Sequence, residues 1–350
     1  KRIVSMVEED LRPSHIIDER SFRNVIRVNT AIGGSTNAPP HITAVARHAG
    51  HDMTVQAWEE YGYDVPLLVN MQPAGTYLGE AFYRSGGVPS VMRALLDAGL
   101  LDGDAKTVTG KTVCENVAQA PEPDHDVIFS CNRPLRHEAG FVVLSGNLFD
   151  SALMKTSVIS EDFAQRFLSH PDHPGVFEAK AVVFEGPEDY HERINDPNLE
   201  IDEESILFIR NVGPIGYPGA AEVVNMQPPD ALVASGIQHL PTVGDGRQSG
   251  TSESPSILNA SPESAIGGGL LYLKTGDRVR LDIPGRTLEA LVNDQQWAQR
   301  MRETKPSIPE SQTPWQELYR NHVGQLSDGG CLELATSFQK IGRVLPRDNH

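Results

Sequence analysis

The sequence has few of the features that mark a membrane protein or a nucleic-acid-binding protein. Its longest apolar runs, such as residues 65–69 and 141–144, are much shorter than the roughly 18 residues of a membrane-spanning helix, which excludes such helices. Positive charge is also scarce, because 30 Lys and Arg stand against 47 Asp and Glu, a net charge of −17. No basic stripe offsets this charge, so we expect neither a nucleic acid nor a membrane as a partner.

Cysteine is rare as well. The chain has three, Cys114, Cys131 and Cys331, which lie 17 and 200 residues apart. An odd number at such spacing argues against a disulfide framework and a local metal site, and it favours a reducing compartment. We therefore predict free thiols and a cytoplasmic location. The first residues lack a signal peptide and an initiator Met, and they open in an amphipathic pattern, so we expect a part of a longer protein.

The length of 350 residues favours two domains and allows a substantial core. In the first part, apolar periodicity predicts helices near residues 21–27 and 42–49 and another between Pro89 and Gly99. A short apolar run at residues 65–69 predicts a buried strand between them. This alternation of helix and strand predicts an α/β layer.

Residues 118–134 are polar and rich in proline, which predicts a domain linker or a long crossing loop. The chain then becomes rich in β-forming residues. Four runs bounded by Gly, Pro and Asn predict strands: residues 141–144, 181–184, 206–209 and 278–283. The last run alternates strictly between apolar and polar residues, so one face of this strand should be exposed to solvent. With helices expected only near residues 160–168 and 293–304, the second part is predicted to be a barrel or sandwich with peripheral helices.

Two glycine-rich segments lead to polar side chains that could carry chemistry. Residues 31–37 (AIGGSTN) place small hydrogen-bonding groups beside a helix, where backbone amides can hold a carboxylate or phosphate; a plain helix N-cap is the alternative. Residues 213–222 form a rigid loop of Gly and Pro that ends in one carboxylate, Glu222. A solvated or capping glutamate is the alternative there.

Two further segments are rich in glycine. Residues 244–254 combine three glycines with the hydroxyl groups of Ser249 and Thr251 on either side of Gly250, and they fit neither a hydrolase elbow nor a P-loop. A binding site and a flexible surface loop are equally open for this segment. Residues 267–269 (GGG) predict close backbone packing at the start of a strand.

The order of these segments resembles the dihydroxy-acid and sugar-acid dehydratase family. The similar stretches cover nearly the whole chain: residues 31–38 (AIGGSTNA), 86–92 (GGVPSVM), 100–112 (LLDGDAKTVTGKT), 213–222 and 245–250 (DGRQSG). Three more stretches look closer to the sugar-acid (aldonate) branch, such as arabinonate or xylonate dehydratases: residues 136–140 (RHEAG), 145–149 (SGNLF) and 247–252 (RQSGTS).

The resemblance implies that a 2,3-dihydroxy acid loses water to give a 2-keto-3-deoxy acid. It implies a 2Fe–2S cluster as Lewis acid on the C3 hydroxyl and a Mg²⁺ ion on the carboxylate and C2 hydroxyl. It places the base, a serine alkoxide, at Ser249, and a magnesium ligand at Glu222. The alkoxide needs cationic charge nearby to exist at neutral pH. The remaining implied residues bind substrate: Ser35, Thr36, Asn37 and Thr251.

The resemblance also implies what this chain lacks. The three cysteines match none of the family's cluster motifs, so no iron–sulfur ligand is expected here. The cluster ligands and the other magnesium ligands, a carbamoylated lysine included, lie in the N-terminal half of the family's proteins. We therefore expect this chain alone to be inactive.

The implied fold is α/β. Residues 1–136 would be the C-terminal part of the α/β iron–sulfur-binding domain, and residues 137–350 a β-barrel-like domain with flanking helices. The active site would lie between the two domains, in a homodimer or homotetramer.

Three alternatives stay open. The substrate could be a branched-chain dihydroxy acid, which predicts an apolar pocket, or 6-phosphogluconate, which predicts an added basic cluster. The chain could also be a catalytically silent remnant that acts as a binding or scaffold subunit.

Overall fold

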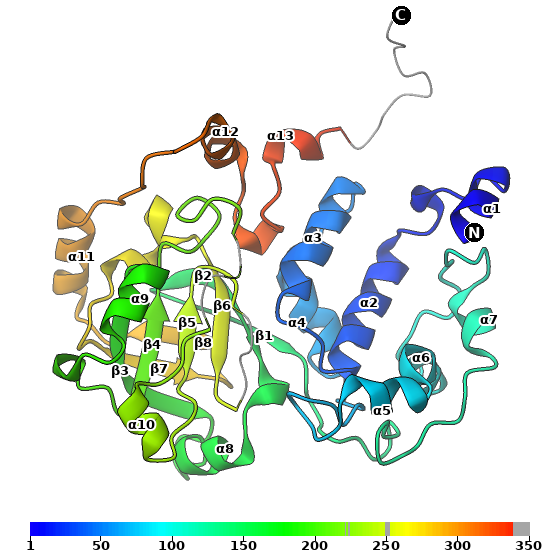
Figure 1. The fold of residues 1–350 in the computed structure, drawn as a ribbon, viewed down its shortest axis with the longest axis horizontal. Helices are drawn as coiled ribbons and strands as arrows, with labels where there is room; N and C mark the ends of the chain where they lie inside the picture. Colours follow the sequence, from blue (N-terminus) through cyan, green and yellow to red (C-terminus); the bar gives the residue numbers. More distant parts are fainter. Residues whose placement is uncertain (221, 223–224, 249–252, 339–350) are drawn as a thin grey trace, which may run out of the picture.

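The computed structural model describes residues 1–220, 222, 225–248 and 253–338. Figure 1 shows two regions side by side: helices formed by the first part of the chain, and a β-barrel with helices around it formed by the rest. Residues 118–140 join the two regions and carry only isolated β-bridges and turns. The proline-rich stretch that predicts a crossing loop lies within this connection.

The helical region consists of seven short helices: α1 (Arg2–Glu8), α2 (Glu19–Ala31), α3 (Ala38–His48), α4 (Gln56–Gly62), α5 (Gly79–Arg84), α6 (Gly87–Asp97) and α7 (Val113–Val117). Helix α2 begins at Asp18, whose carboxylate accepts a hydrogen bond from the Ser21 amide at 2.9 Å, a capping arrangement that satisfies a free helix donor. The three helices predicted from periodicity are confirmed as α2, α3 and α6.

The strand predicted at residues 65–69 is only partly realised. Its side chains are buried, as expected, but its pairing consists of single bridges, Leu67 with Arg136 and Val69 with Ile128. The partners belong to the irregular connection at residues 118–140, which does not run alongside long enough to form a ladder. This segment is therefore a core element of the helical region without a regular sheet around it.

The second region is a closed barrel of eight strands: β1 (Phe141–Gly146), β2 (Phe149–Lys155), β3 (Val176–Phe184), β4 (Ser205–Ile209), β5 (Thr242–Gly244), β6 (Ser256–Ser261), β7 (Arg278–Asp282) and β8 (Thr287–Ala290). Their order around the barrel is β1-β2-β6-β5-β4-β3-β7-β8. Strands β3 to β6 pair in parallel, whereas β1-β2, β2-β6, β3-β7 and β7-β8 are antiparallel.

Large apolar side chains fill the barrel. Val142, Met154, Val183, Phe208 and Ile257 belong to one buried cluster that draws on strands all around the ring. Because side chains occupy the interior of a small barrel of this kind, a substrate site has to lie outside it. All four predicted strands of this region are confirmed, and β7 alternates between buried and exposed residues as expected.

Short helices lie around the barrel: α8 (Glu161–Phe167), α9 (Pro187–Arg193), α10 (Asp230–Ala234), α11 (Asp294–Glu303) and α12 (Pro314–His322). The last helix, α13 (Glu333–Thr336), lies beside α3 of the helical region, where Glu333 forms an ion pair with Arg47. Helices α8 and α11 confirm the two that were predicted. The strand expected after residues 267–269 is wrong, because a 3₁₀ turn, η5 (Gly269–Tyr272), follows instead. The expected close packing is present, since a Cβ on Gly268 would lie 1.9 Å from the Pro262 carbonyl oxygen.

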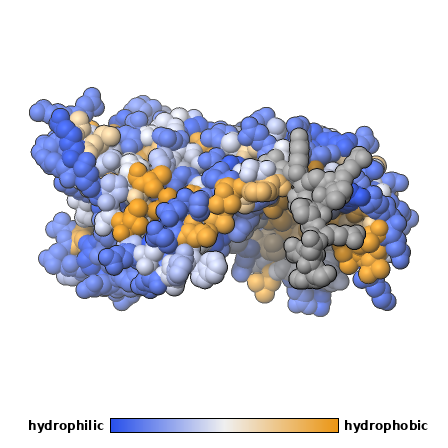
Figure 2. Space-filling view, turned by 90° about the horizontal axis from the view of Figure 1, so that it is seen from above, coloured by the Kyte–Doolittle hydropathy of each residue, from blue (hydrophilic) through white to orange (hydrophobic). Residues whose placement is uncertain are grey.

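A shared apolar core joins the helical region to the outside of the barrel. The rings of Trp58 on α4 and Phe141 on β1 meet edge to face with centroids 5.4 Å apart, and Ile26 and Leu153 belong to the same cluster. The outer face of the molecule seen in Figure 2 is mostly hydrophilic, with apolar residues in separate patches. Among the helices described, none is long and apolar enough to cross a membrane.

Candidate active site

The segment after α2 turns sharply because of its two glycines. Gly33 has φ +65°, which a residue with a side chain rarely adopts, and a Cβ on Gly34 would lie 2.1 Å from Oδ1 of Asn29. The chain then enters α3 at Asn37. The Asn37 side chain makes no cap hydrogen bond; its Nδ2 donates instead to the carbonyl oxygen of Gln248 at 3.3 Å. The polar segment at residues 31–37 thus reaches the barrel region.

Gln248 belongs to the loop that follows β5, and a buried carboxylate fixes the start of this loop. Asp245 is fully buried and accepts hydrogen bonds from the amides of Asn211 (3.1 Å), Val212 (3.0 Å) and Ser264 (2.8 Å). Burial raises the pKa of Asp245, while these donors oppose that shift. Asp245 therefore ties the loop to the first residues of the segment that leads to Glu222.

A second buried carboxylate holds the middle of that segment. Glu263 accepts from the amides of Ile215 (3.0 Å) and Gly216 (2.8 Å) and from Nε2 of Gln325 (2.9 Å). Burial raises its pKa too. Neither Asp245 nor Glu263 has an ion-pair partner within the described part of the chain, so main-chain amides take the place of a cation. The sequence did not predict either residue, because buried acids look like surface acids when only the sequence is read.

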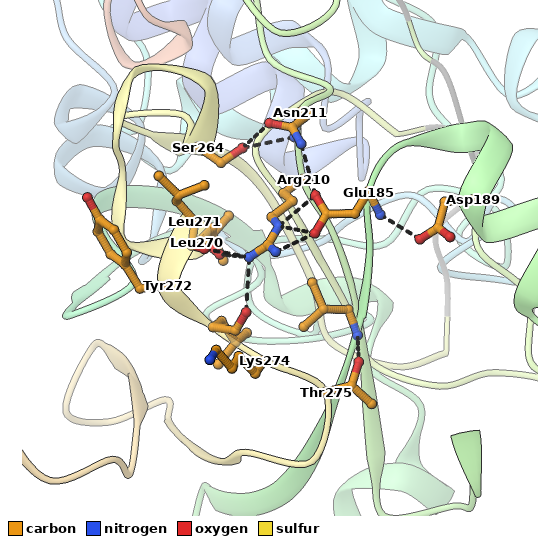
Figure 3. A network of polar contacts seen from close by, with 12 residues as sticks. Glu185, Asp189, Arg210, Asn211, Ser264, Leu270, Leu271, Tyr272, Lys274 and Thr275 are labelled. Carbon is orange, nitrogen blue, oxygen red and sulfur yellow. Dashed lines mark hydrogen bonds and ion pairs between the residues drawn. The ribbon is translucent and has the colours of Figure 1, made fainter. Parts of the chain in front are cut away.

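An arginine at the end of β4 secures the neighbouring side of the barrel (Figure 3). Arg210 forms an ion pair with Glu185, and Asn211 donates from Nδ2 to the same carboxylate at 3.0 Å. The Arg210 Nη1 group donates to three main-chain oxygens of one turn: Leu270 (2.7 Å), Leu271 (2.8 Å) and Leu273 (3.0 Å). This network holds the backbone at Asn211, where the loop with the predicted metal ligand begins.

The predicted metal ligand lies beside the predicted base loop. Glu222 is exposed, and its backbone forms a parallel bridge with that of Arg247. Arg247 donates from Nε to the carbonyl oxygen of Ala220 at 2.6 Å and from Nη1 to Nε2 of His41 on α3 at 2.8 Å. Ser249 follows two positions later, but Ser249 and Thr251 lie outside the described residues, and their roles stay predictions.

A cavity of about 530 Å³ lies where the two regions meet. It is lined by residues 32–37 and 71–73, by Gln248 and by Lys155 of β2. The structure therefore brings Ser35, Thr36 and Asn37 together at one cavity, as their predicted role in substrate binding requires. Lys155 and residues 71–73 belong to this wall, and the sequence did not predict a place in the site for any of them.

The described residues do not form a complete metal site. No group of three or more His, Cys, Asp and Glu that could hold a metal ion occurs among them. The three cysteines are free thiols, as predicted: Cys114 is exposed, Cys131 is half-buried and Cys331 is buried. An iron–sulfur cluster therefore finds no ligand set in this part of the chain, and Glu222 offers one carboxylate oxygen donor for Mg²⁺.

Glycine-rich segments of the helical region and of the barrel meet at this cavity, and ligand sites often lie where two structural units meet. Comparison with family models gives the class. Residues 1–116 match the dihydroxy-acid/6-phosphogluconate dehydratase N-terminal model, and residues 126–330 match the corresponding C-terminal model. The chain belongs to the dihydroxy-acid/6-phosphogluconate dehydratase family, as the order of its glycine-rich segments predicts.

Individual relatives agree with this assignment. The chain is 56% identical over 350 residues to a D-xylonate dehydratase of Caulobacter vibrioides and 40% identical over 351 residues to an L-arabinonate dehydratase of Rhizobium leguminosarum bv. trifolii. Both matches cover the whole of this chain. It is 35% identical over 331 residues, 93% of the chain, to a dihydroxy-acid dehydratase of Acidothermus cellulolyticus. The chain spans 59%, 58% and 56% of the length of these three relatives.

Proposed function

We propose that this chain is part of a sugar-acid dehydratase, which removes water from an aldonate to give a 2-keto-3-deoxy acid. The observation that carries the proposal is the make-up of the cavity between the two regions. Its described lining residues include one cation, Lys155, several neutral hydrogen-bonding groups and three apolar residues, Ile32, Met71 and Pro73, but no carboxylate. Such a wall fits a small anion with many hydroxyl groups. The names of the relatives, a D-xylonate and an L-arabinonate dehydratase, support the same substrate class.

The reaction has two difficulties, a weakly acidic proton on C2 and a poor leaving group on C3. We assign proton removal to Ser249, which directly follows Gln248 in the wall of the cavity. Asp245 fixes the start of this loop, and Asn37 holds it against the helical region. Residues 33–37 line the cavity from the helical side, where we expect them to contact the substrate.

The cofactors are proposed from the family resemblance. When bound in the full-length protein, Mg²⁺ and a 2Fe–2S cluster would supply the positive charge that the developing enediolate, the serine alkoxide and the departing hydroxide need. We assign Glu222 as one magnesium ligand, because it is exposed, its backbone pairs with that of Arg247, two positions before the proposed base, and hard cations prefer oxygen donors.

Polar groups on the helical side of the cavity are suited to bind the hydroxyl groups of the substrate. Thr36 and Asn37 provide a hydroxyl and an amide in the cavity wall. Oδ1 of Asn37 is buried and has no hydrogen-bond partner among the residues described, so it can accept from a substrate hydroxyl. A site that binds hydroxyl groups in this way discriminates strongly against analogues without them.

The test is a substrate panel with the full-length protein carrying its metal groups. Keto-acid formation is measured from D-xylonate, L-arabinonate, 6-phosphogluconate and a branched-chain dihydroxy acid. We expect turnover of a five-carbon aldonate and loss of at least about 100-fold in kcat for Ser249→Ala, in line with the weight of an essential base. Conversion of the branched-chain acid alone would disprove the assignment. Absence of turnover on all four would favour a silent binding or scaffold subunit.

A further inference from the structure

Lys155 is a buried cation with no acidic partner in the described part of the chain. Its side chain is 5% exposed, and its Nζ donates to the carbonyl oxygens of Gly33 at 3.1 Å and Gly34 at 3.0 Å. Within the described residues it forms no ion pair. Burying an unpaired ammonium group costs free energy, so a lysine used only to fill this position would be a poor choice beside an apolar residue.

The two carbonyl groups belong to a segment that is held from both sides. The amide of Gly33 donates to the carbonyl oxygen of Thr30 at 2.9 Å, and the amide of Gly34 donates to that of Asn29 at 2.8 Å, so the end of α2 fixes the amide side. Lys155 fixes the carbonyl side. The peptide planes on either side of Gly34 are thereby set by a helix of one region and a strand of the other.

This orientation determines where the next amide points. In a trans peptide the C=O and N–H groups face opposite ways, so a Gly34 carbonyl that points to Lys155 turns the Ser35 amide away from it. In the described part of the chain, the amides of Ser35 and Thr36 donate to no protein group. Both residues line the cavity, and free main-chain donors beside a buried cation are suited to oxygen atoms of an anionic ligand.

We propose that Lys155 is a positioning residue for the sugar acid, and that it acts by holding the Gly33 and Gly34 carbonyls so that the Ser35 amide can donate to a substrate oxygen. This inference rests on the proposed function. It adds a residue of the barrel to the binding of substrate by the helical region. It also explains why a lysine stands in a strand that is otherwise mostly apolar and buried.

The chain provides a matched control. Lys180 of β3 is half-buried and also donates from Nζ to two main-chain oxygens, those of Leu199 and Glu200. It does not line the cavity. Replacing either lysine by methionine removes an ammonium group that binds two carbonyls, so the two variants differ in their location and not in the kind of hydrogen bond that is removed.

The experiment compares Lys155→Met and Lys180→Met with the wild type in the full-length, metal-loaded protein. We expect Lys155→Met to raise KM for the aldonate about tenfold or more and to change kcat less than about threefold. A tenfold change corresponds to the free energy of one charge-assisted hydrogen bond. Hydrogen exchange of a peptide covering residues 33–37 should accelerate about tenfold in the same variant without substrate. Lys180→Met should leave both quantities within about twofold of the wild type.

A second variant of Lys155 separates a positioning role from a role in folding. Lys155→Gln, which keeps one hydrogen-bond donor, should fall between the wild type and the methionine variant. Unchanged KM and unchanged exchange in both Lys155 variants would overturn the inference while leaving the proposed function intact, provided the wild type converts an aldonate. Loss of folding in both would also overturn it, because Lys155 would then serve the fold as a whole. If the wild type neither binds nor converts a sugar acid, the proposed function fails first.

Discussion

Asn37 at the start of α3 donates from Nδ2 to the main-chain oxygen of Gln248 at 3.3 Å, across 211 positions of the chain. This bond connects a glycine-rich segment of the helical region to the loop that carries the proposed base. Among the described residues a second polar contact joins the same loop to α3, because Nη1 of Arg247 donates to Nε2 of His41 at 2.8 Å. The loop is therefore held by the helical region as well as by the barrel.

Removal of the Asn37 side chain should weaken this connection. We expect Asn37→Ala to lower the free energy of unfolding by about 1 kcal/mol, the usual net value of a hydrogen bond. It should also raise KM for an aldonate more than about fivefold, because the cavity loses one of its buried acceptors, Oδ1 of Asn37. Urea denaturation and steady-state kinetics measure the two effects. The control is Asn195→Ala, whose hydrogen bonds join Asp230 away from the cavity, and which should leave KM unchanged.

The carboxylate of Asp245 should be essential for the geometry of the base loop. In Asp245→Asn an amide NH₂ would face main-chain donors of residues 211, 212 or 264, and leaving buried donors unpaired costs about 1–3 kcal/mol of stability. We therefore expect a lower denaturation midpoint and reduced kcat. Asp150→Asn, an exposed position on the same barrel, should behave like the wild type. Equal midpoints for both variants would contradict the role of Asp245.

Lys155 should make stability depend on pH at alkaline values. Burial lowers its pKa from 10.5 to about 8 in the folded protein. Between these values the unfolded chain binds more protons than the folded one, so the free energy of unfolding should rise as pH increases from 8 to 10.5. The gain is at most about 3 kcal/mol. Denaturation at a series of pH values across this window should show the rise as the wild type minus Lys155→Met; a flat difference would disprove it.

The edge-to-face contact of Trp58 with Phe141 should make the helical region and the barrel unfold together. Trp58→Ala removes a fully buried ring from the core that the two regions share, so we expect the free energy of unfolding to fall by about 3–5 kcal/mol. Differential scanning calorimetry should show a lower Tm and a broader or divided transition. Trp315→Ala is the control, because that indole is 77% exposed and should leave the transition in place.

The 350-residue chain by itself should not form keto acid. Its described residues contain no group of three His, Cys, Asp or Glu that could hold a metal ion, and the chain spans 59% of the D-xylonate dehydratase it matches. We expect the purified chain, supplied with iron, sulfide and magnesium, to dehydrate an aldonate no faster than the uncatalysed reaction in buffer. Turnover above this value would show that the chain supplies all the groups the reaction needs.

Local sequence patterns predicted much of the fold. Regular apolar spacing identified α2 and α6, and the alternation in β7 identified a strand with one wet face. Strand β2 was missed because its burial pattern is nearly continuous rather than alternating: one of its faces packs in the barrel and the other against the helical region. The strand at residues 65–69 was predicted from burial, but burial alone does not supply a neighbouring strand.

The candidate site was predictable only in its glycine-rich parts. Ser35, Thr36 and Asn37 stand beside glycines that a tight turn requires, and this local pattern drew attention to the segment; their role in substrate binding, which the family resemblance implies, stays a prediction. Lys155, Asp245 and Glu263 act through contacts with residues far along the chain, which a single sequence does not reveal. Glu263, for example, binds amides of residues 215 and 216, and Lys155 binds carbonyls more than 100 positions away.

The cavity has one wall from residues 32–37 and 71–73 and an opposite wall from the barrel. Under the proposed function, substrate preference depends on two stretches that recombination can separate. A chimera that takes only its barrel from a relative would combine two unrelated halves of a binding surface. Exchange of preference between an aldonate enzyme and a branched-chain enzyme should succeed only when both walls are transplanted together.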